Sequence, residues 1–393
     1  MADTENTAAA VRPFSLSVPD ADLADLRHRL QMTRLPDEAP GSGWTHGTSL
    51  DWLRPVLAYW RDEFDWRVQE ALLNAMPNYK VRMDGIDLHF VHVPGRGPHP
   101  CPLLLSHGWP GSLFEFTDLI PRLTDPARFG GAAEDAFTVV APSLPGYGLS
   151  FEPGQPRFGI AAIADCFARL MTDVLGYSRF AAQGGDWGSL ITTTLGATVP
   201  DRLIGIHLNL LLIPREIVAR AGGTPEEQAF LRAHARWRRE ETGYLWMQGT
   251  RPQTLAYALT DSPAGLAAWI LEKFHAWSGG QAPPDVTFDL DTLLANISLY
   301  WFSGAIGSSF WPYYDRLHAP WPVPGGRVSV PTAYAAFPAE HLHPPRSLAE
   351  QTFTDLRRWT PMAKGGHFAA LECPDALAED IRAFFRPLRA SLG

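Results

Sequence analysis

The chain has 393 residues, 46% of them hydrophobic, which suits one large domain with an addition and a sizeable core. Its net charge of −9 is spread without long acidic runs and no basic stripe appears, so the composition argues against a nucleic-acid partner. Three widely spaced cysteines, Cys101, Cys166 and Cys373, indicate neither a disulfide framework nor a zinc site and favour a reducing compartment.

Residues 1–11 have the composition of a loose tail. The N-terminus lacks the basic start and apolar run of a signal peptide. No stretch of the chain reaches the roughly 18 apolar residues of a membrane span. The sequence therefore predicts a cytoplasmic protein without a membrane anchor.

Residues 12–78 are predicted to form a helical N-terminal segment, with no strand before Tyr79. In "VPDADLADLRHRLQMTR" the leucines fall on one face of a helix, at positions Leu23, Leu26 and Leu30. The stretch "SLDWLRPVLAYWRDEFDWRVQEALL" predicts a second helical region, interrupted near Pro55.

Beyond this segment the pattern changes to strands. A hairpin is indicated around Asp84-Gly85, and short, nearly continuous apolar runs follow: "PLLLSHG", "FTVVAPS", "RFAAQGG", "LIGIHLNLLL" and "PTAYAAF". Helical patterns lie between several of these runs. Buried strands that alternate with helices are typical of a mostly parallel sheet flanked by helices on both faces, an α/β fold.

No clear strand occurs from about Ile213 to about Val328, where the patterns are helical. An insertion of this size within a continuing sheet is most simply a helical cap over one end. The predicted parts are the N-terminal helical segment (12–78), a first part of the core (79–213), the cap (214–327) and a second part of the core (328–393).

The stretch "RFAAQGGDWGSLITTTLGA" predicts a strand, a tight glycine turn and a helix, with Asp186 at the centre of the turn. The helix N-terminus favours an ionised carboxylate there. In open sheets of this type ligands bind beyond the carboxyl ends of the strands. Many hydrolases carry a serine at such a turn, which is called a nucleophile elbow.

Over nearly its whole length the chain resembles the α/β-hydrolase-fold epoxide hydrolases, in the branch of the microsomal and juvenile hormone enzymes. The matching stretches, in order, are "VPDADLADLRHRL", "LLSHGWPGSLFEF", "PSLPGYGLS", "GGDWGSLI", "ETGYLWMQGTRPQTLAYALTDSPAGLAAWILEKF", "FPAEHLHPPRS" and "KGGHFAALECPDALAEDI". The resemblance implies that Asp186 attacks an epoxide carbon, forms an alkyl ester and is regenerated when water attacks that ester. It also implies that the N-terminal segment wraps the sheet and braces the cap.

The resemblance assigns the oxyanion hole to the backbone N–H groups of Trp109, in "HGWPG", and Trp187, next to the nucleophile. It gives His107 a supporting role in holding the loop. Without that context, "HGWPG" is also typical of an ordinary tight turn after a strand.

His367 has the late position expected of the hydrolase-fold histidine and is the predicted general base. Glu340 follows a strand, precedes His367 and is the predicted orienting acid, with Asp315 as the weaker rival. The pair His341 and His343 is a lone HxH pattern, which is typical of a loop, so no metal is expected.

The epoxide oxygen needs proton donors, for which the family uses two cap tyrosines. The match to "ETGYLWMQ" gives Tyr244. The second falls in "SSFWPYYDRL", where the alignment prefers Tyr313 to the adjacent Tyr314. More often, a tyrosine is a packed aromatic side chain whose hydroxyl has a hydrogen-bond partner and no catalytic role.

The predicted function is therefore hydrolysis of epoxides to vicinal diols. The rivals are a dehalogenase that uses the same aspartate and a catalytically silent binding protein on the same fold, while a serine esterase lacks its GxSxG elbow. We expect a small lipophilic epoxide and water as partners, in detoxification or secondary metabolism. No cofactor is implied, and a homodimer stays open.

Overall fold

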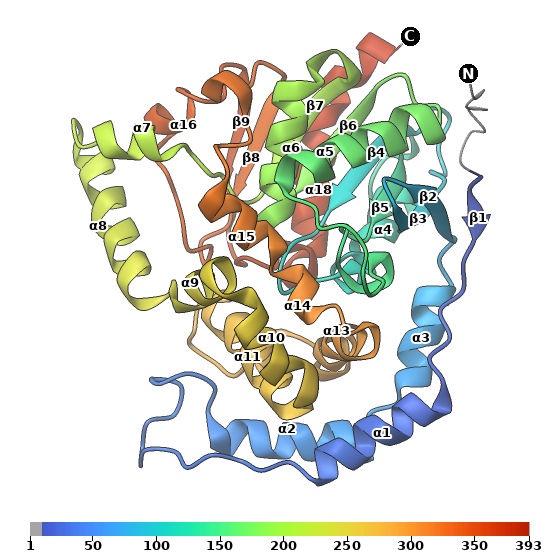
Figure 1. Ribbon diagram of the computed structural model, residues 1–393. Coiled ribbons are helices and arrows are strands. Elements are labelled where there is room, and N and C mark those ends of the chain that lie inside the picture. The colour runs from blue at the N-terminus through green and yellow to red at the C-terminus, as the bar shows by residue number, and fades with distance from the viewer. Residues whose placement is uncertain (1–9, 393) are drawn as a thin grey trace, which may run out of the picture.

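The computed structural model describes residues 10–392, so most of the predicted tail lies outside the described residues. A nine-stranded sheet in the order β1-β2-β3-β5-β4-β6-β7-β8-β9 runs through the molecule (Figure 1). The three pairings from β1 to β5 are antiparallel, and the others are parallel. The predicted α/β-hydrolase fold, a mostly parallel sheet flanked by helices, is confirmed.

The strands are β1 (Arg12–Pro13), β2 (Asn78–Met83), β3 (Ile86–Val93), β4 (Cys101–Ser106), β5 (Phe137–Pro142), β6 (Phe180–Gly184), β7 (Leu203–Leu208), β8 (Thr332–Ala336) and β9 (Leu356–Pro361). Strands β6 and β7 are buried along their whole length, because helices cover both faces of the sheet at its centre.

Two pairs of helices cover the sheet. On one face, α5 (Ile160–Arg169) packs on α6 (Asp186–Thr198). On the other, α4 (Leu119–Thr124) packs on α18 (Pro374–Phe385). The short helices α16 (Arg346–Ala349) and α17 (Ala369–Glu372) lie in the loops after β8 and β9.

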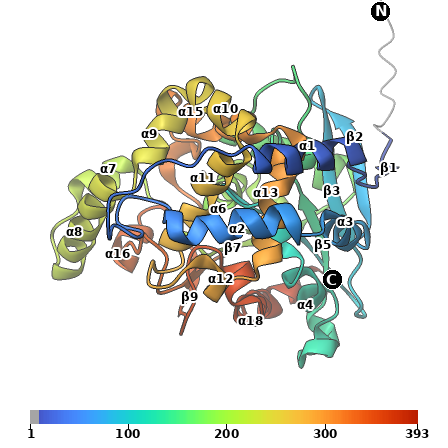
Figure 2. The ribbon, with the colours of Figure 1, turned by 90° about the horizontal axis from the view of Figure 1, so that it is seen from below.

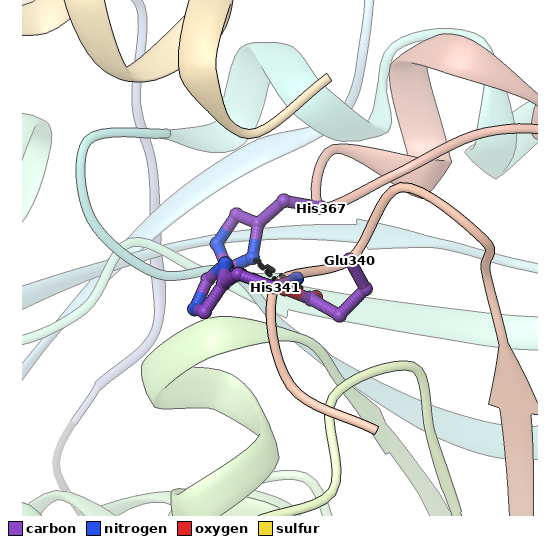
Figure 3. A group of neighbouring side chains, drawn as sticks. All are labelled: Glu340, His341 and His367. Atoms are coloured by element: carbon purple, nitrogen blue, oxygen red, sulfur yellow. Dashed lines mark hydrogen bonds and ion pairs between the residues drawn. The ribbon is translucent and has the colours of Figure 1, made fainter. Parts of the chain in front are cut away.

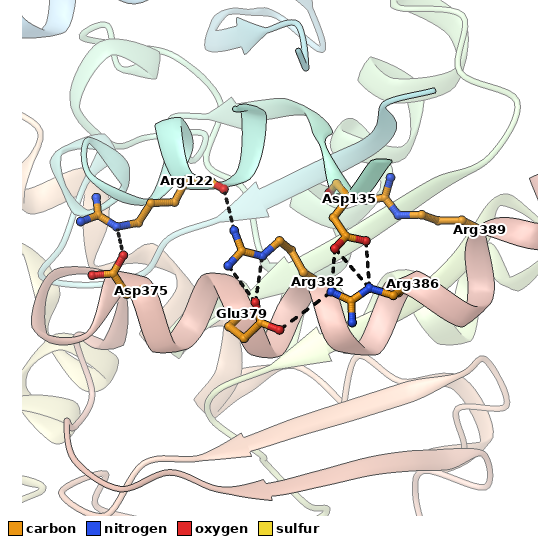
Figure 4. A network of polar contacts seen from close by, with 7 residues as sticks. All are labelled: Arg122, Asp135, Asp375, Glu379, Arg382, Arg386 and Arg389. Atoms are coloured by element: carbon orange, nitrogen blue, oxygen red, sulfur yellow. Dashed lines mark hydrogen bonds and ion pairs between the residues drawn. The ribbon is translucent and has the colours of Figure 1, made fainter. Parts of the chain in front are cut away.

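Arginines hold α18 and the segment after it against the rest of the core (Figure 4). Arg382 donates to the backbone carbonyl of Arg122, at 3.2 Å. Arg386 donates to both oxygens of the buried Asp135 side chain, and Arg389 donates to backbone carbonyls beside it. These bonds connect residues more than 250 positions apart in the sequence.

Helices fill the chain between β7 and β8; in Figure 1 the first two lie at the left of the molecule and most of the others lie below the sheet. They are α7 (Arg215–Arg220), α8 (Pro225–Glu240), α9 (Gly243–Thr250), α10 (Pro252–Asp261), α11 (Pro263–Ala276), α12 (Pro284–Thr287), α13 (Leu290–Ser303), α14 (Ile306–Ser309) and α15 (Trp311–His318). We call them the inserted helices.

The N-terminal helices α1 (Asp20–Gln31), α2 (Leu50–Asp62) and α3 (Trp66–Asn74) run along the inserted helices (Figure 2). The indole N–H of Trp60 donates to the Ser298 hydroxyl of α13 at 3.0 Å, and the Tyr59 hydroxyl donates to Asp291 at 2.8 Å. The N-terminal segment therefore contacts the helices that lie over the strand ends.

Three details differ from the sequence expectations. Strand β1 precedes Tyr79 and pairs with β2, and it was missed because it has only two residues. Strand β9 was missed because it is an edge strand with one buried residue, Leu356, and so lacks an apolar run. Helix α2 continues through Pro55 to Asp62, because its buried face packs well enough to outweigh the missing N–H.

Within residues 10–392, no helix has the length and apolarity that crossing a bilayer requires.

Candidate active site

The turn between β6 and α6 is tight because glycines surround it. A Cβ atom on Gly188 would lie 1.8 Å from the Ser106 carbonyl oxygen, and one on Gly184 would lie 2.1 Å from the Gly188 carbonyl oxygen. Asp186 has φ = 48°, in the left-handed region that side chains other than glycine seldom adopt. This strain lifts its carboxylate out of the turn, at the carboxyl end of β6.

The Asp186 carboxylate has one contact on each oxygen. Oδ1 accepts a hydrogen bond of 2.7 Å from the backbone N–H of Trp109, in the loop after β4. Oδ2 lies 3.3 Å from Nε2 of His367. The described contacts include no bond of this kind from the Trp187 N–H, which belongs to the first turn of α6.

His367 and Glu340 lie at the ends of the loops after β9 and β8, and both are buried. Nδ1 of His367 is 3.0 Å from each oxygen of Glu340, and its other ring nitrogen faces Asp186. The three side chains thus form a continuous chain of polar contacts. The rival acid, Asp315, accepts instead from the backbone N–H of Ile160, at the start of α5.

The neighbouring charges govern the protonation of His367 and Glu340. Burial alone would lower the pKa of His367, but the carboxylates of Glu340 and Asp186 outweigh it and raise the pKa well above its usual value. Burial would also raise the pKa of Glu340, but His367 and His341 hold it well below its usual value. Loss of the Asp186 charge would remove one cause of the raised pKa of His367.

His341 stands beside this pair (Figure 3). Its Nδ1 is 2.8 Å from Oε1 of Glu340, and its ring stacks on that of His367. Glu340, His341 and His367 are close enough to share a metal ion, with donor atoms within 4.8 Å of one another. A metal would have to displace the bonds between His367 and Glu340. His343, the other half of the HxH pair, lies near Tyr334 instead.

Two buried tyrosines from the inserted helices lie near Asp186. Tyr244 of α9 stacks on Trp109, with ring centroids 5.5 Å apart. Tyr313 of α15 meets the rings of Tyr244 and Trp187 edge to face, at 5.6 and 4.6 Å. Burial first, and the charge of Asp186 in addition, raise the pKa of both phenols well above the usual value, so both stay protonated. Tyr314 faces elsewhere and stacks on Trp311 and His318.

His107 holds the loop that carries Trp109. Its Nδ1 is 3.2 Å from the Gly108 carbonyl, and its Nε2 accepts from the backbone N–H of Leu144. Burial lowers the pKa of His107 to about 4, so the ring is neutral and each nitrogen has a fixed role. The inserted helix α13 holds the same loop, since the Tyr300 hydroxyl donates to the Gly111 carbonyl.

A small cavity borders Asp186 and His367, with a volume of about 20 Å³. This is room for about one water molecule. Glu115 also lines the cavity, and sequence reasoning missed it. Burial raises its pKa to about 8, assisted by the charge of Asp186. A Cβ atom on Gly111 would lie 1.4 Å from Oε1 of Glu115, so only glycine leaves room for this carboxyl. The available signal was a single acid inside the apolar run "SLFEF".

Two family models match the chain. One is described as "Epoxide hydrolase N terminus" and matches residues 11–116, and the other is described as "alpha/beta hydrolase fold" and matches residues 102–215.

Relatives match over nearly the full length. A protein of Stigmatella aurantiaca is 43% identical over 380 residues, which cover 97% of this chain and 86% of that protein. Epoxide hydrolase 1 of Oryctolagus cuniculus is 38% identical, over 95% of this chain and 88% of that protein. The crystal structure of juvenile hormone epoxide hydrolase from the silkworm Bombyx mori is 30% identical, with a TM-score of 0.89 over 99% of this chain and 97% of that chain.

Proposed function

Because the chain belongs to the epoxide hydrolases of the α/β-hydrolase fold, we propose that Asp186 is the nucleophile of its reaction. The enzyme converts an epoxide into a vicinal diol through a covalent ester on an aspartate. This membership decides for the epoxide over the dehalogenase and the silent binding protein. The observation that supports Asp186 most is its pair of contacts, Trp109 N–H on one oxygen and His367 on the other.

In the first step a carboxylate oxygen of Asp186 attacks an epoxide carbon, and the carbon–oxygen bond of the ring breaks. Tyr244 and Tyr313 give the released alkoxide its proton. Both phenols are buried and remain protonated, so at least one proton is available at the start of every turnover.

In the second step water attacks the carbonyl carbon of the Asp186 ester. His367 takes a proton from this water and passes it to the departing diol oxygen, while Glu340 orients the ring. The negative oxygen that forms on Asp186 is held by the N–H of Trp109 and, after a small shift of the new ester, by that of Trp187. The second proton of the water restores the tyrosine.

The hydrolytic water fits the small cavity beside Asp186 and His367. Glu115 lines this cavity and can hold the water through its carboxyl group. The substrate is a lipophilic epoxide, because a larger cavity that Trp187 lines has mostly apolar walls.

A single turnover in ¹⁸O-labelled water tests this mechanism. The ester route puts the label into Asp186 and leaves the first diol unlabelled, and mass spectrometry of the peptide that contains Asp186 detects it. The Asp186→Asn variant is the control and should form no ester. A labelled diol in the first turnover, with unlabelled Asp186, would show that water attacks the epoxide directly.

We also propose a cytoplasmic location, which the three unpaired, buried cysteines support. Detoxification or secondary metabolism as the physiological role, and a homodimer, stay predictions. Fractionation of cells with an antibody to the chain, and light scattering of the purified protein, test the location and the dimer.

A further inference from the structure

The larger cavity, of about 540 Å³, adjoins the active site. Trp187 lines it, and the same indole ring contacts Tyr313. Thr242 and Leu245, on either side of Tyr244 in the sequence, line it as well. Its volume falls within the range of about 300–1,000 Å³ that accommodates a drug-sized ligand. The cavity therefore offers the body of a substrate a place next to the two tyrosines.

The walls of this cavity are apolar apart from Thr242 and a set of basic side chains. Arg215 from the start of α7, Arg238 from the end of α8 and Arg316 from α15 all line it, together with His234. No aspartate or glutamate of the described residues lines it. Three separate helices thus bring three cations to one chamber in a protein whose net charge is −9.

Arg316 lies deepest among these arginines. Arg215 and Arg238 are exposed, whereas Arg316 is half-buried, with its guanidinium 4.4 Å from the ring centroid of Trp321. Burial lowers its pKa, and the charge of Arg215 lowers it further.

None of the three guanidinium groups forms an ion pair or a side-chain hydrogen bond in the described part of the chain. The charges of Glu216 and Asp315 act on Arg316 without forming an ion pair with it: Asp315 accepts from the backbone of Ile160, and Glu216 is exposed and does not line the cavity. A half-buried cation without an anionic partner is costly unless a ligand supplies the anion.

We infer, on the basis of the proposed function, that the substrate is an apolar epoxide that carries a carboxylate. Its hydrocarbon body lies in the chamber, its epoxide reaches Asp186 between Tyr244 and Tyr313, and its carboxylate binds Arg316 with help from Arg215 and Arg238. Guanidinium groups suit this task because they bind carboxylates in a planar, two-pronged geometry. An ω-epoxy fatty acid has this chemistry.

The test compares ω-epoxy fatty acids of medium chain length with their methyl esters, which keep the epoxide and the chain but lose the charge. We expect kcat/KM to be about tenfold to a hundredfold higher for the acids, the usual strength of a hydrogen bond to a charged group. Arg316→Met should remove this preference, so that acids and esters have equal kcat/KM in the variant. Arg316→Glu should make the acids poorer substrates than the esters.

Arg236→Met is the matched control, since Arg236 is an exposed arginine of α8 that does not line the cavity. It should leave both substrate series unchanged. Equal kcat/KM for acids and esters in the wild type, or a preference that survives Arg316→Met, would overturn the inference.

A binding measurement separates this inference from the proposed function. Calorimetry with decanoate, an acid without an epoxide, is carried out on Asp186→Asn and on Asp186→Asn combined with Arg316→Met. Weaker binding to the second variant, by about tenfold or more, supports the carboxylate site. Equal binding to the two variants overturns the carboxylate site. If the wild type nevertheless hydrolyses styrene oxide, the proposed function still holds.

Discussion

Tyr313 and Tyr314 are neighbours in the sequence but have different surroundings. Tyr313 is buried against Tyr244 and Trp187, whereas Tyr314 lies half-buried between Trp311 and His318. On a helix, adjacent side chains point about 100° apart, so only one of two consecutive tyrosines can face Asp186.

The adjacent tyrosines provide a variant and its control. Tyr244→Phe and Tyr313→Phe should each slow formation of the ester by about a hundredfold, because each removes a proton donor to the alkoxide, and the double variant should form almost no diol. Tyr314→Phe should keep wild-type rates. Stopped-flow tryptophan fluorescence in a single turnover measures ester formation, and full turnover by the double variant would refute the assignment of the donors.

Glu115 should act in the second half of the reaction. Glu115→Leu keeps the volume but cannot hold water, so it should slow ester hydrolysis by about tenfold to a hundredfold while ester formation stays the same. Glu115→Gln should retain most of the rate, because below a pKa of about 8 the native carboxyl is protonated and an amide offers the same acceptor and a donor. Quenched-flow accumulation of the ester distinguishes the two steps. An unchanged hydrolysis rate in Glu115→Leu would remove this residue from the mechanism.

Between elements, the close approach of two turns builds the site. The loop after β4 packs against the β6–α6 turn so tightly that a Cβ atom on Gly108 would lie 2.1 Å from Oδ1 of Asp186. Parallel pairing of β4 with β6 brings the two turns to the same edge of the sheet. The inserted helix α13 holds the first loop from the other side through Asn296 and Tyr300.

Gly108→Ala should therefore lower kcat by about a hundredfold or more, because the loop must retreat and withdraw the Trp109 N–H from Asp186. Gly223→Ala is the control, since a Cβ atom there meets nothing closer than 3.7 Å and its activity should be unchanged. Circular dichroism checks that both variants are folded. A fully active Gly108→Ala enzyme would contradict the role of this loop.

At the scale of the whole molecule, the N-terminal segment and the inserted helices share a buried interface. Trp60 of α2 is only 2% exposed and donates a hydrogen bond to Ser298 of α13. Because α13 also holds the Trp109 loop, the N-terminal segment supports the active site without contributing a side chain to it.

Trp60→Ala should lower the free energy of unfolding by about 3–5 kcal/mol, the usual cost of removing a buried tryptophan. Leu72→Ala, on the same segment but 54% exposed, should change it by no more than about 0.5 kcal/mol. Urea denaturation followed by circular dichroism and by activity should give one coincident transition. If the N-terminal segment unfolded in a separate transition and activity persisted, the segment would not support the active site.

The sequence alone was sufficient for the elements whose patterns are local. The strand, glycine turn and helix around Asp186 lie within one stretch of chain, and the apolar runs of β4 to β8 mark buried strands wherever they occur. The edge strand β9 and the two-residue β1 could not be predicted, because exposed strands need no apolar run. Helix α2 continues through Pro55 because burial of its apolar face outweighs the low helix propensity of proline. Residue types and chain order also indicated Glu340 and His367, but not the contact between them.

Only the tertiary structure decided which side chains meet. Tyr313 rather than Tyr314 faces Tyr244, Glu115 enters a cavity with His367 from 252 positions away, and three arginines from separate helices line one chamber. The physical reason is that these contacts depend on how elements pack across long separations in the chain. A single sequence carries no periodic signal for such packing.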